Sequence, residues 1–170
     1  WLKHACGVVS EAGRPMEWIT PNGFTVFQAY RAIEEHKVTI TWAGKPQQIR
    51  LRSKSTVIAP RKCVNGVSAN FVHSQDAAHL MLVANCAVDN KITDFAFVHD
   101  SFATHACNTG LLNEVLRECF IEQYRDDTLD DLYAQLQDQV STEVFNKIEP
   151  PPHRGNMDLE AVRDSLYFFA

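Results

Sequence analysis

A chain of 170 residues with 45% hydrophobic and 22% charged residues suits one compact domain or two small subdomains that share a core. No apolar run approaches the roughly 18 residues that a membrane span needs, so we expect no contact with a membrane. The formal net charge of −5 is mildly acidic, and it conceals a strong segregation of charge along the chain.

The positive charge is concentrated in residues 31–62. This segment holds eight basic and two acidic residues, a net charge of +6, whereas the rest of the chain carries −11. An acidic protein that collects its positive charge in one segment favours a polyanionic partner for that segment. Charge alone leaves one alternative open, a solvated charged hairpin without a partner.

The first residues and the cysteines indicate whether the chain is a fragment and in which redox compartment it folds. Trp1-Leu2-Lys3 contains no initiating Met and reads as the middle of a helix, so we expect a fragment of a longer protein. The five cysteines are widely spread and include no CxxC pair, which argues against a disulfide framework or a structural zinc site. Free thiols in a reducing, intracellular compartment are expected instead.

Alternating patterns predict two hairpins in the first third of the chain. Residues 16–30 should form two short strands joined by a turn at Pro21-Asn22-Gly23. Residues 38–42 and 48–52 alternate strictly and predict a second hairpin, at about 34–55. One face of this hairpin is apolar (Val38, Ile40, Trp42, Ile49, Leu51) and the other is polar and basic (Thr39, Thr41, Gln48, Arg50, Arg52).

Helical patterns dominate the remainder. The strongest candidate spans residues 70–88 and begins near Asn70. Phe95-Ala96-Phe97-Val98 is expected to be a short buried strand that runs directly into His99-Asp100-Ser101. Further helices are predicted over residues 109–124 and 128–140, with a short one after Asp158 as its N-cap.

An apolar strand that ends in a carboxylate is a common way to hold a hard cation, and Asp100 occupies such a position. Carboxylate oxygens suit Mg²⁺, and two carboxylates from different segments can hold two ions about 4 Å apart for phosphoryl transfer. Asp94 cannot be the second carboxylate, because six residues of strand place it roughly 20 Å away. On the pattern alone, a turn with a capped Asp is the more common arrangement, by roughly three to one. A Ser-His-Asp hydrolase is disfavoured, because neighbours on an extended segment point to opposite faces.

Several motifs carry a family resemblance over nearly the whole chain. Phe71-Val72-His73-Ser74-Gln75-Asp76 followed by Val98-His99-Asp100-Ser101-Phe102 resembles the single-subunit, bacteriophage-type DNA-directed RNA polymerases of phages and mitochondria. Glu17-Trp18-Ile19-Thr20-Pro21 with Gly23-Phe24, and the terminal Phe168-Phe169-Ala170, are similar to that family as well. Residues 31–69 match it only in type, and 105–157 weakly.

This resemblance implies roles for the strand-turn motif and the preceding helix. Asp100 would be the family's second metal-binding aspartate, sharing two Mg²⁺ ions with an Asp outside this chain. His73 would lie near the ribose 2′-hydroxyl of the incoming nucleotide, whereas His79 is expected to pack in the interior. His99 and Ser101 would support the turn. The aromatic end, Phe169 and Ala170, would pack back toward the active centre.

The basic hairpin gains a role by the same resemblance. In the phage members a hairpin at this place enters the promoter major groove, which accommodates a two-stranded ribbon. Lys37, Gln48, Arg50 and Arg52 are therefore expected to contact DNA. The implied partners are double-stranded promoter and template DNA, the RNA product, ribonucleoside triphosphates and the rest of the polymerase.

We therefore expect an α+β fold that forms the C-terminal part of a polymerase right hand. Residues 1–72 would be the end of the fingers, including the hairpin, and residues 73–170 the palm with its C-terminal helices. The family's first metal-binding Asp and its fingers Lys and Tyr are not in this sequence, so the isolated chain should be inactive. We favour a phage-infected or prophage-bearing bacterium as the location, with the mitochondrial matrix as the alternative.

Two other functions remain open at this point. A DNA polymerase of the bacterial repair type also ends a palm strand in His-Asp, but it has Glu where this chain has Ser101. A module that binds nucleic acid without chemistry would use the same basic hairpin. Mg²⁺ binding at Asp100 would distinguish an enzyme from such a module.

Overall fold

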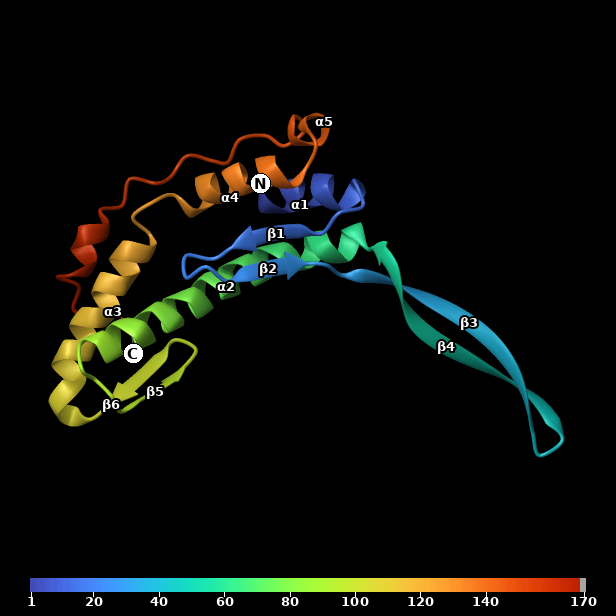
Figure 1. The fold of residues 1–170 in the computed structure, drawn as a ribbon, viewed down its shortest axis with the longest axis horizontal. Coiled ribbons are helices and arrows are strands. Elements are labelled where there is room, and N and C mark those ends of the chain that lie inside the picture. Colours follow the sequence, from blue (N-terminus) through green and yellow to red (C-terminus); the bar gives the residue numbers. More distant parts are fainter. Residues whose placement is uncertain (169–170) are drawn as a thin grey trace.

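The computed structural model describes residues 1–168; Phe169 and Ala170, predicted to pack toward the active centre, lie outside the described residues. Within residues 1–168, helices are combined with three separate hairpins, and every strand pairs antiparallel with its neighbour in sequence. The predicted α+β class is thereby confirmed. Helix α2 (Pro60–Asp89) runs through the middle of the molecule (Figure 1) and contacts elements that lie both before and after it in the chain.

The first half of α2 carries the larger of two hydrophobic cores. It packs against helix α1 (Leu2–Glu11), a hairpin of β1 (Met16–Ile19) and β2 (Thr25–Gln28), and helix α4 (Thr128–Gln139). The α1 core residues Ala5, Cys6 and Val9 are completely buried. Other buried members of this core are Met16, Trp18, Cys63, Val67, Phe71, Leu132 and Leu136.

The hairpin β1–β2 forms where the alternating pattern predicted it. Its turn contains Gly23 at a φ of +82°, a conformation that glycine adopts without strain. The register turns Trp18 inward, where its Nε1 donates to the hydroxyl oxygen of Ser74 at 2.9 Å. The indole ring also packs against Phe71, with 5.7 Å between ring centroids. Trp18 therefore joins this hairpin to α2.

Truncating Trp18 should destabilise the fold strongly. Because its side chain is 1% exposed, Trp18→Ala leaves a large cavity and should lower the free energy of unfolding by about 3–5 kcal/mol. The matched control is Trp42→Ala, since Trp42 is 68% exposed and its loss should cost about 0.5 kcal/mol or less. Urea unfolding followed by far-ultraviolet circular dichroism measures both; equal losses of stability would contradict the assigned core.

Helix α2 is longer than predicted. It begins at Pro60 rather than near Asn70, with Pro at the first helical position, where a missing N–H costs nothing. Gly66 lies inside this added portion and does not break it. A Cβ there would stand 3.2 Å from a ring carbon of Tyr30, so glycine permits a close approach of neighbouring side chains. The proposed boundary between residues 72 and 73 falls within this continuous helix, and the subdomain assignment stays a prediction.

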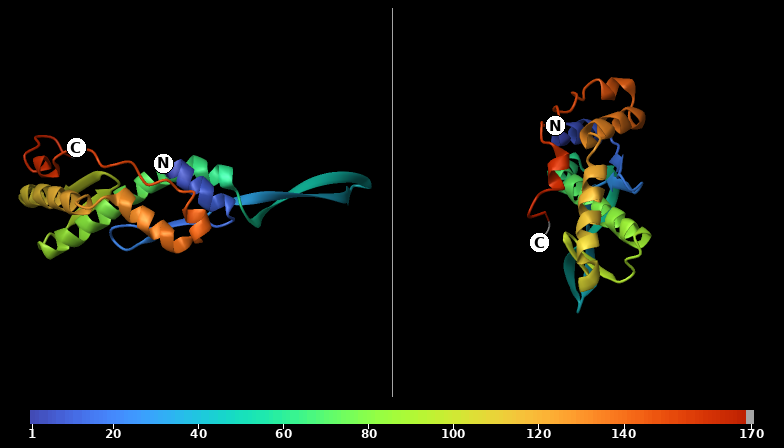
Figure 2. Two further views of the ribbon diagram at one scale, coloured as in Figure 1. Left: turned by 90° about the horizontal axis from the view of Figure 1, so that it is seen from above. Right: turned by 90° about the vertical axis from the view of Figure 1, so that its left-hand side faces the viewer.

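The second hairpin projects from the body as a long arm (Figures 1 and 2). It consists of β3 (Arg31–Trp42) and β4 (Lys45–Ile58), so it extends well beyond the predicted residues 34–55. The two-residue turn Ala43-Gly44 has positive φ at both positions, the pattern of a tight type I′ hairpin turn. At about 3.3 Å per residue the arm is roughly 40 Å long.

The second half of α2 carries a smaller core with helix α3 (Thr109–Gln123) and the hairpin of β5 (Phe95–Val98) and β6 (Ser101–Thr104). Strand β5 and helix α3 were both predicted, but the expectation that β5 is buried is wrong. Phe95 and Phe97 are half-buried, whereas Val98 is 65% exposed. A two-stranded hairpin has one face on the core, so four apolar residues in a row cannot all be covered.

The C-terminal segment returns along the body. After α4 and the short helix α5 (Thr142–Phe145), residues 146–158 run back toward α3 (Figure 1). A 3-10 helix, η2 (Leu159–Val162), then begins as predicted with Asp158, whose carboxylate accepts from the Glu160 N–H at 3.0 Å. In the part of the chain that the structure describes, no helix combines the length and the apolar character needed to cross a membrane.

Candidate active site and nucleic-acid interface

Asp100 lies at the tip of the β5–β6 hairpin. Val98 pairs with Ser101, so His99 and Asp100 form a two-residue turn, and His99 adopts a φ of +54°. Histidine is one of the few side chains that tolerate this left-handed region, which supports a role for His99 in shaping the turn. Asp100 is exposed, and its carboxylate has no side-chain hydrogen bond or ion pair with any residue between 1 and 168. The alternative of a capped, self-satisfied Asp is thereby disfavoured.

A cavity of about 870 Å³ opens between this turn and helix α2. From the turn it is lined by His99 and Asp100, and from α2 by the exposed His73 and Asp76 and the half-buried Leu80. These helical positions are spaced i, i+3 and i+7, so they share one face of the helix. The structure thus brings His73 and Asp100, which are 27 positions apart in sequence, to one cavity.

Asp76 is a further residue of this site, for which no role was expected from the sequence. Its carboxylate lies on the same wall as His73, and the i+3 spacing within the His73-Ser74-Gln75-Asp76 motif is the signal that identifies it. Asp94, in contrast, lies at the opposite end of the hairpin from Asp100. Its carbonyl accepts from the Thr104 hydroxyl at 2.7 Å, and the neighbouring pair Phe95 and Thr104 closes that end. Asp94 is therefore excluded as a partner of Asp100, as predicted.

His79 lies behind this cavity and packs in the interior, as expected. Its ring meets Phe102 and Phe120 edge to face, at centroid distances of 5.9 and 5.8 Å. Burial lowers the pKa of His79 below its ordinary value, partly offset by the Leu116 carbonyl oxygen 3.3 Å from its Nε2. The lowered pKa favours the uncharged ring at neutral pH, so His79 contributes packing and hydrogen bonding rather than charge.

The register of the arm confirms the two predicted faces. Lys37 lies directly opposite Arg50, and Gln48 and Arg52 lie on the same face as this pair. Glu35 neutralises Arg52 in part, because the Arg52 Nε donates to its carboxylate at 2.8 Å. Lys37 and Arg50 form no ion pair with any residue that the structure describes. Two cations held opposite each other repel, which favours an anionic ligand on this face.

Comparison with known proteins decides the family. The family model of the DNA-dependent RNA polymerases matches residues 2–149. This chain belongs to that family. The resemblance to single-subunit, phage-type RNA polymerases is confirmed, and the motifs around His73 and Asp100 lie inside the matched range.

Individual polymerases of this family match almost the entire chain. DNA-directed RNA polymerase 3, chloroplastic, from Nicotiana sylvestris is 36% identical over 169 residues, which is 99% of this chain and 16% of that protein. DNA-directed RNA polymerase 1, mitochondrial, from Arabidopsis thaliana is 34% identical over 169 residues, with the same coverage. DNA-directed RNA polymerase 2A from Nicotiana tabacum is 33% identical over 174 residues and is covered to 48%.

These relatives differ from this chain in length, and two of them are named by compartment. The chain spans about 16% of the length of the first of these relatives. Relatives are named as chloroplastic or mitochondrial proteins, which gives no support to the preference for a phage-infected bacterium.

Proposed function

We propose that this chain forms the part of a single-subunit RNA polymerase that presents one catalytic aspartate, Asp100, together with a DNA-binding arm. The reaction is DNA-templated RNA synthesis, in which a 3′-hydroxyl attacks the α-phosphorus of a ribonucleotide and pyrophosphate leaves. The observation that carries the proposal is the cavity that His73 and Asp100 line together. The cavity leaves room for a phosphate group and its metal ions beside the Asp100 carboxylate, which pairs with no side chain in residues 1–168.

The donors around this cavity fit Mg²⁺ in type. Asp100 and Asp76 line it with carboxylate oxygens, the ligand atoms that this ion prefers. Among the described residues, no three His, Cys, Asp or Glu side chains gather closely enough to bind a metal alone, so further ligands would come from elsewhere in the polymerase. Two bound ions would stabilise the charge that develops on the attacking and leaving oxygens. Asp100 would hold them, and His99 would keep the turn in shape.

The isolated chain is proposed to be inactive. Its motifs include neither the family's first metal-binding Asp nor the fingers Lys and Tyr, so the rest of the enzyme would have to supply them. Promoter and template DNA, the RNA product and ribonucleoside triphosphates would be shared with that remainder. The names of the relatives favour an organelle, including the mitochondrial matrix, as the compartment.

Replacing His73 tests the nucleotide-binding side of the cavity. If its imidazole hydrogen-bonds to the ribose 2′-hydroxyl, His73→Ala in the full-length enzyme should reduce the preference for ribonucleotides over deoxyribonucleotides by about 5–10-fold, the value of one hydrogen bond. The measurement is kcat/KM for a matched pair of nucleotides. Val72→Ala, one residue away and 55% exposed, is the control. An unchanged preference in His73→Ala would remove this histidine from the ribose site.

Replacing Asp100 in the full-length enzyme is the direct test of the whole proposal, and elongation should be lost. The exposed basic face of the arm also suits a module that binds nucleic acid without chemistry. Normal elongation by the Asp100 variant, with the arm still required for DNA binding, would favour that second function.

A further inference from the structure

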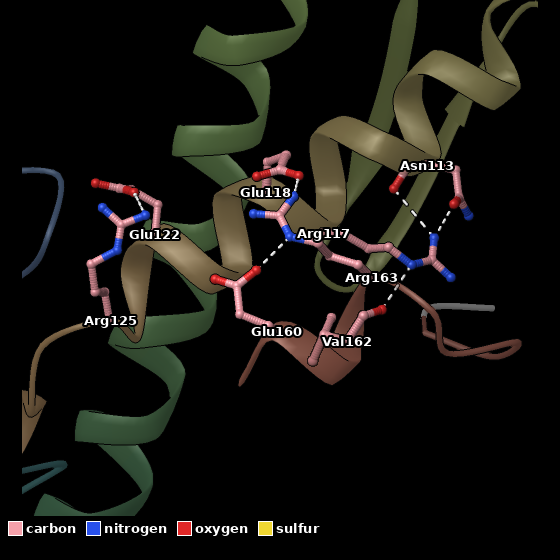
Figure 3. A network of polar contacts seen from close by, with 8 residues as sticks. All are labelled: Asn113, Arg117, Glu118, Glu122, Arg125, Glu160, Val162 and Arg163. Carbon is pink, nitrogen blue, oxygen red and sulfur yellow. Dashed lines mark hydrogen bonds and ion pairs between the residues drawn. The ribbon is translucent and has the colours of Figure 1, made fainter. Parts of the chain in front are cut away.

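A buried arginine on α3 holds the C-terminal segment of the chain. Arg117 is 8% exposed, and its Nε donates to the Val162 carbonyl at 3.0 Å while its Nη2 donates to the Ser165 carbonyl at 2.6 Å. Its Nη1 donates to the Asn113 side-chain oxygen one helical turn away (Figure 3). Each of the three guanidinium nitrogens therefore has an oxygen acceptor, which offsets the cost of burying the charge.

Arg117 uses its planar fork rather than an ion pair. No carboxylate within residues 1–168 forms a salt bridge with it, whereas the neighbouring Arg163 pairs with Glu118 and Glu160 on the surface (Figure 3). Arg163 is also more open to solvent, with 41% of its side chain exposed. Arg117 and Arg163, which both contact the region of η2, therefore differ in burial and in the partners they bind. One fixes backbone carbonyls in the interior, and the other completes an exposed charge network.

The guanidinium also faces an aromatic ring near the chain end. Its central carbon lies 5.5 Å from the ring centroid of Phe168, within the range of a cation–π contact. Phe168 in turn meets Phe120 edge to face at 5.1 Å. Arg117 therefore orders both the backbone of the segment and its last described aromatic side chain.

From Phe120 the aromatic contacts continue to the catalytic hairpin. Phe120 meets His79 at 5.8 Å, and His79 meets Phe102 of β6 at 5.9 Å. Phe102 follows Asp100 by two residues, and His79 lies on the helix that carries the cavity residue His73. The row Phe168, Phe120, His79 and Phe102, here called the aromatic row, connects the C-terminal segment to both walls of the cavity. Aromatic pairs in such edge-to-face geometry resist displacement.

We propose that Arg117 is a positioning residue of the polymerase reaction. Arg117 holds η2 and Phe168 against α3 and thereby keeps the members of the aromatic row in contact. The row supports the β5–β6 hairpin and so fixes the position of Asp100. This inference rests on the proposed role of Asp100, but it assigns a function to a side chain that touches neither nucleotide nor metal.

The test uses Arg117→Gln and Arg117→Lys in the full-length polymerase. We expect kcat for nucleotide addition to fall by about 10–100-fold, because small displacements of a catalytic group have effects of this size, while KM for ribonucleotides changes little. Lys should not rescue kcat, since an ammonium keeps the charge but lacks the planar fork. Promoter affinity should stay unchanged. Arg163→Gln is the matched control and should keep kcat within about twofold, as expected for an exposed ion pair.

Hydrogen exchange separates this inference from the role of Asp100. Measured without nucleotide or added metal, the exchange of residues 159–168 should accelerate in Arg117→Gln and not in Arg163→Gln. Unchanged exchange in Arg117→Gln would contradict the claim that Arg117 holds residues 159–168 in place. Faster exchange with unchanged kcat would contradict the positioning role. Phe168→Leu, which keeps every Arg117 hydrogen bond, should lower kcat without releasing the segment. If Arg117→Gln does not fold, this variant decides alone, and an unaltered kcat contradicts the proposal.

Discussion

Asp100→Asn in the full-length polymerase should reduce elongation by at least about 10²–10³-fold, the effect of removing one group that stabilises transition-state charge. The substitution preserves size and leaves the exposed turn free of new clashes, because Asp100 packs against no core. Folding and promoter binding should therefore be unchanged. The measurement is single-turnover incorporation on a primed template, with promoter affinity measured in parallel.

Asp94→Asn provides the matched control for Asp100. Both carboxylates are exposed and belong to the same hairpin, but Asp94 lies at the end away from the cavity. Its replacement should leave the rate within about twofold, the range of ordinary surface substitutions. Asp76→Asn, which alters the α2 wall of the cavity, should give an intermediate reduction. A rate near wild type for Asp100→Asn would refute the assigned catalytic role.

The second large effect is expected from the arm. Replacing Lys37 and Arg50 together by serine should weaken promoter binding by about 1–3 kcal/mol for each group that contacts a base, or lower the salt slope by about 0.9 for each phosphate that is no longer neutralised. Both side chains are exposed on one face and directly opposite each other. Their mutual repulsion is relieved in the variant, which offsets part of the arm stability that the shorter side chains lose.

Arg52 makes the prediction for the arm more specific. Because Glu35 already pairs with it, Arg52→Ser should reduce DNA affinity less than Arg50→Ser. Lys147→Ser removes one exposed positive charge from the turn that follows α5 and serves as the charge-matched control. Titrations of promoter DNA over a range of salt concentrations distinguish these cases. Equal slopes for the wild type and the Lys37/Arg50 double variant would exclude the arm from the DNA interface.

Local patterns predicted the elements that depend on local interactions. Strict alternation identified both faces of the arm, and the turn residues around Gly23 located the β1–β2 hairpin. The start of α2 was missed because Gly66 and the scattered polar residues before Asn70 weaken the helical pattern. Contacts between segments fix this part of the helix, since Cys63 and Val67 are buried against α1.

The candidate site was predictable only where a motif marks it. The motifs assigned roles to His73 and Asp100. Asp76 belongs to the same motif as His73, but only the fold places it on the wall of the cavity. Arg117 had no sequence signal at all. Its acceptors on Val162 and Ser165 are 45 and 48 positions away, and no periodic pattern connects segments at that separation. The exposure of Val98 was likewise missed, because composition does not reveal how many faces of a hairpin are covered.

The unbroken course of α2 has a consequence for how this enzyme family can tolerate changes in length. The helix starts two residues after the arm ends and carries His73 thirteen residues further on, a rise of about 20 Å. One residue inserted between positions 61 and 72 would rotate every following side chain by about 100° about the helix axis. The wall of the cavity that carries His73 and the arm would then no longer keep their relative orientation. A change in length at the tip, Ala43-Gly44, would leave this orientation unaltered, whereas a change within the first part of α2 would not.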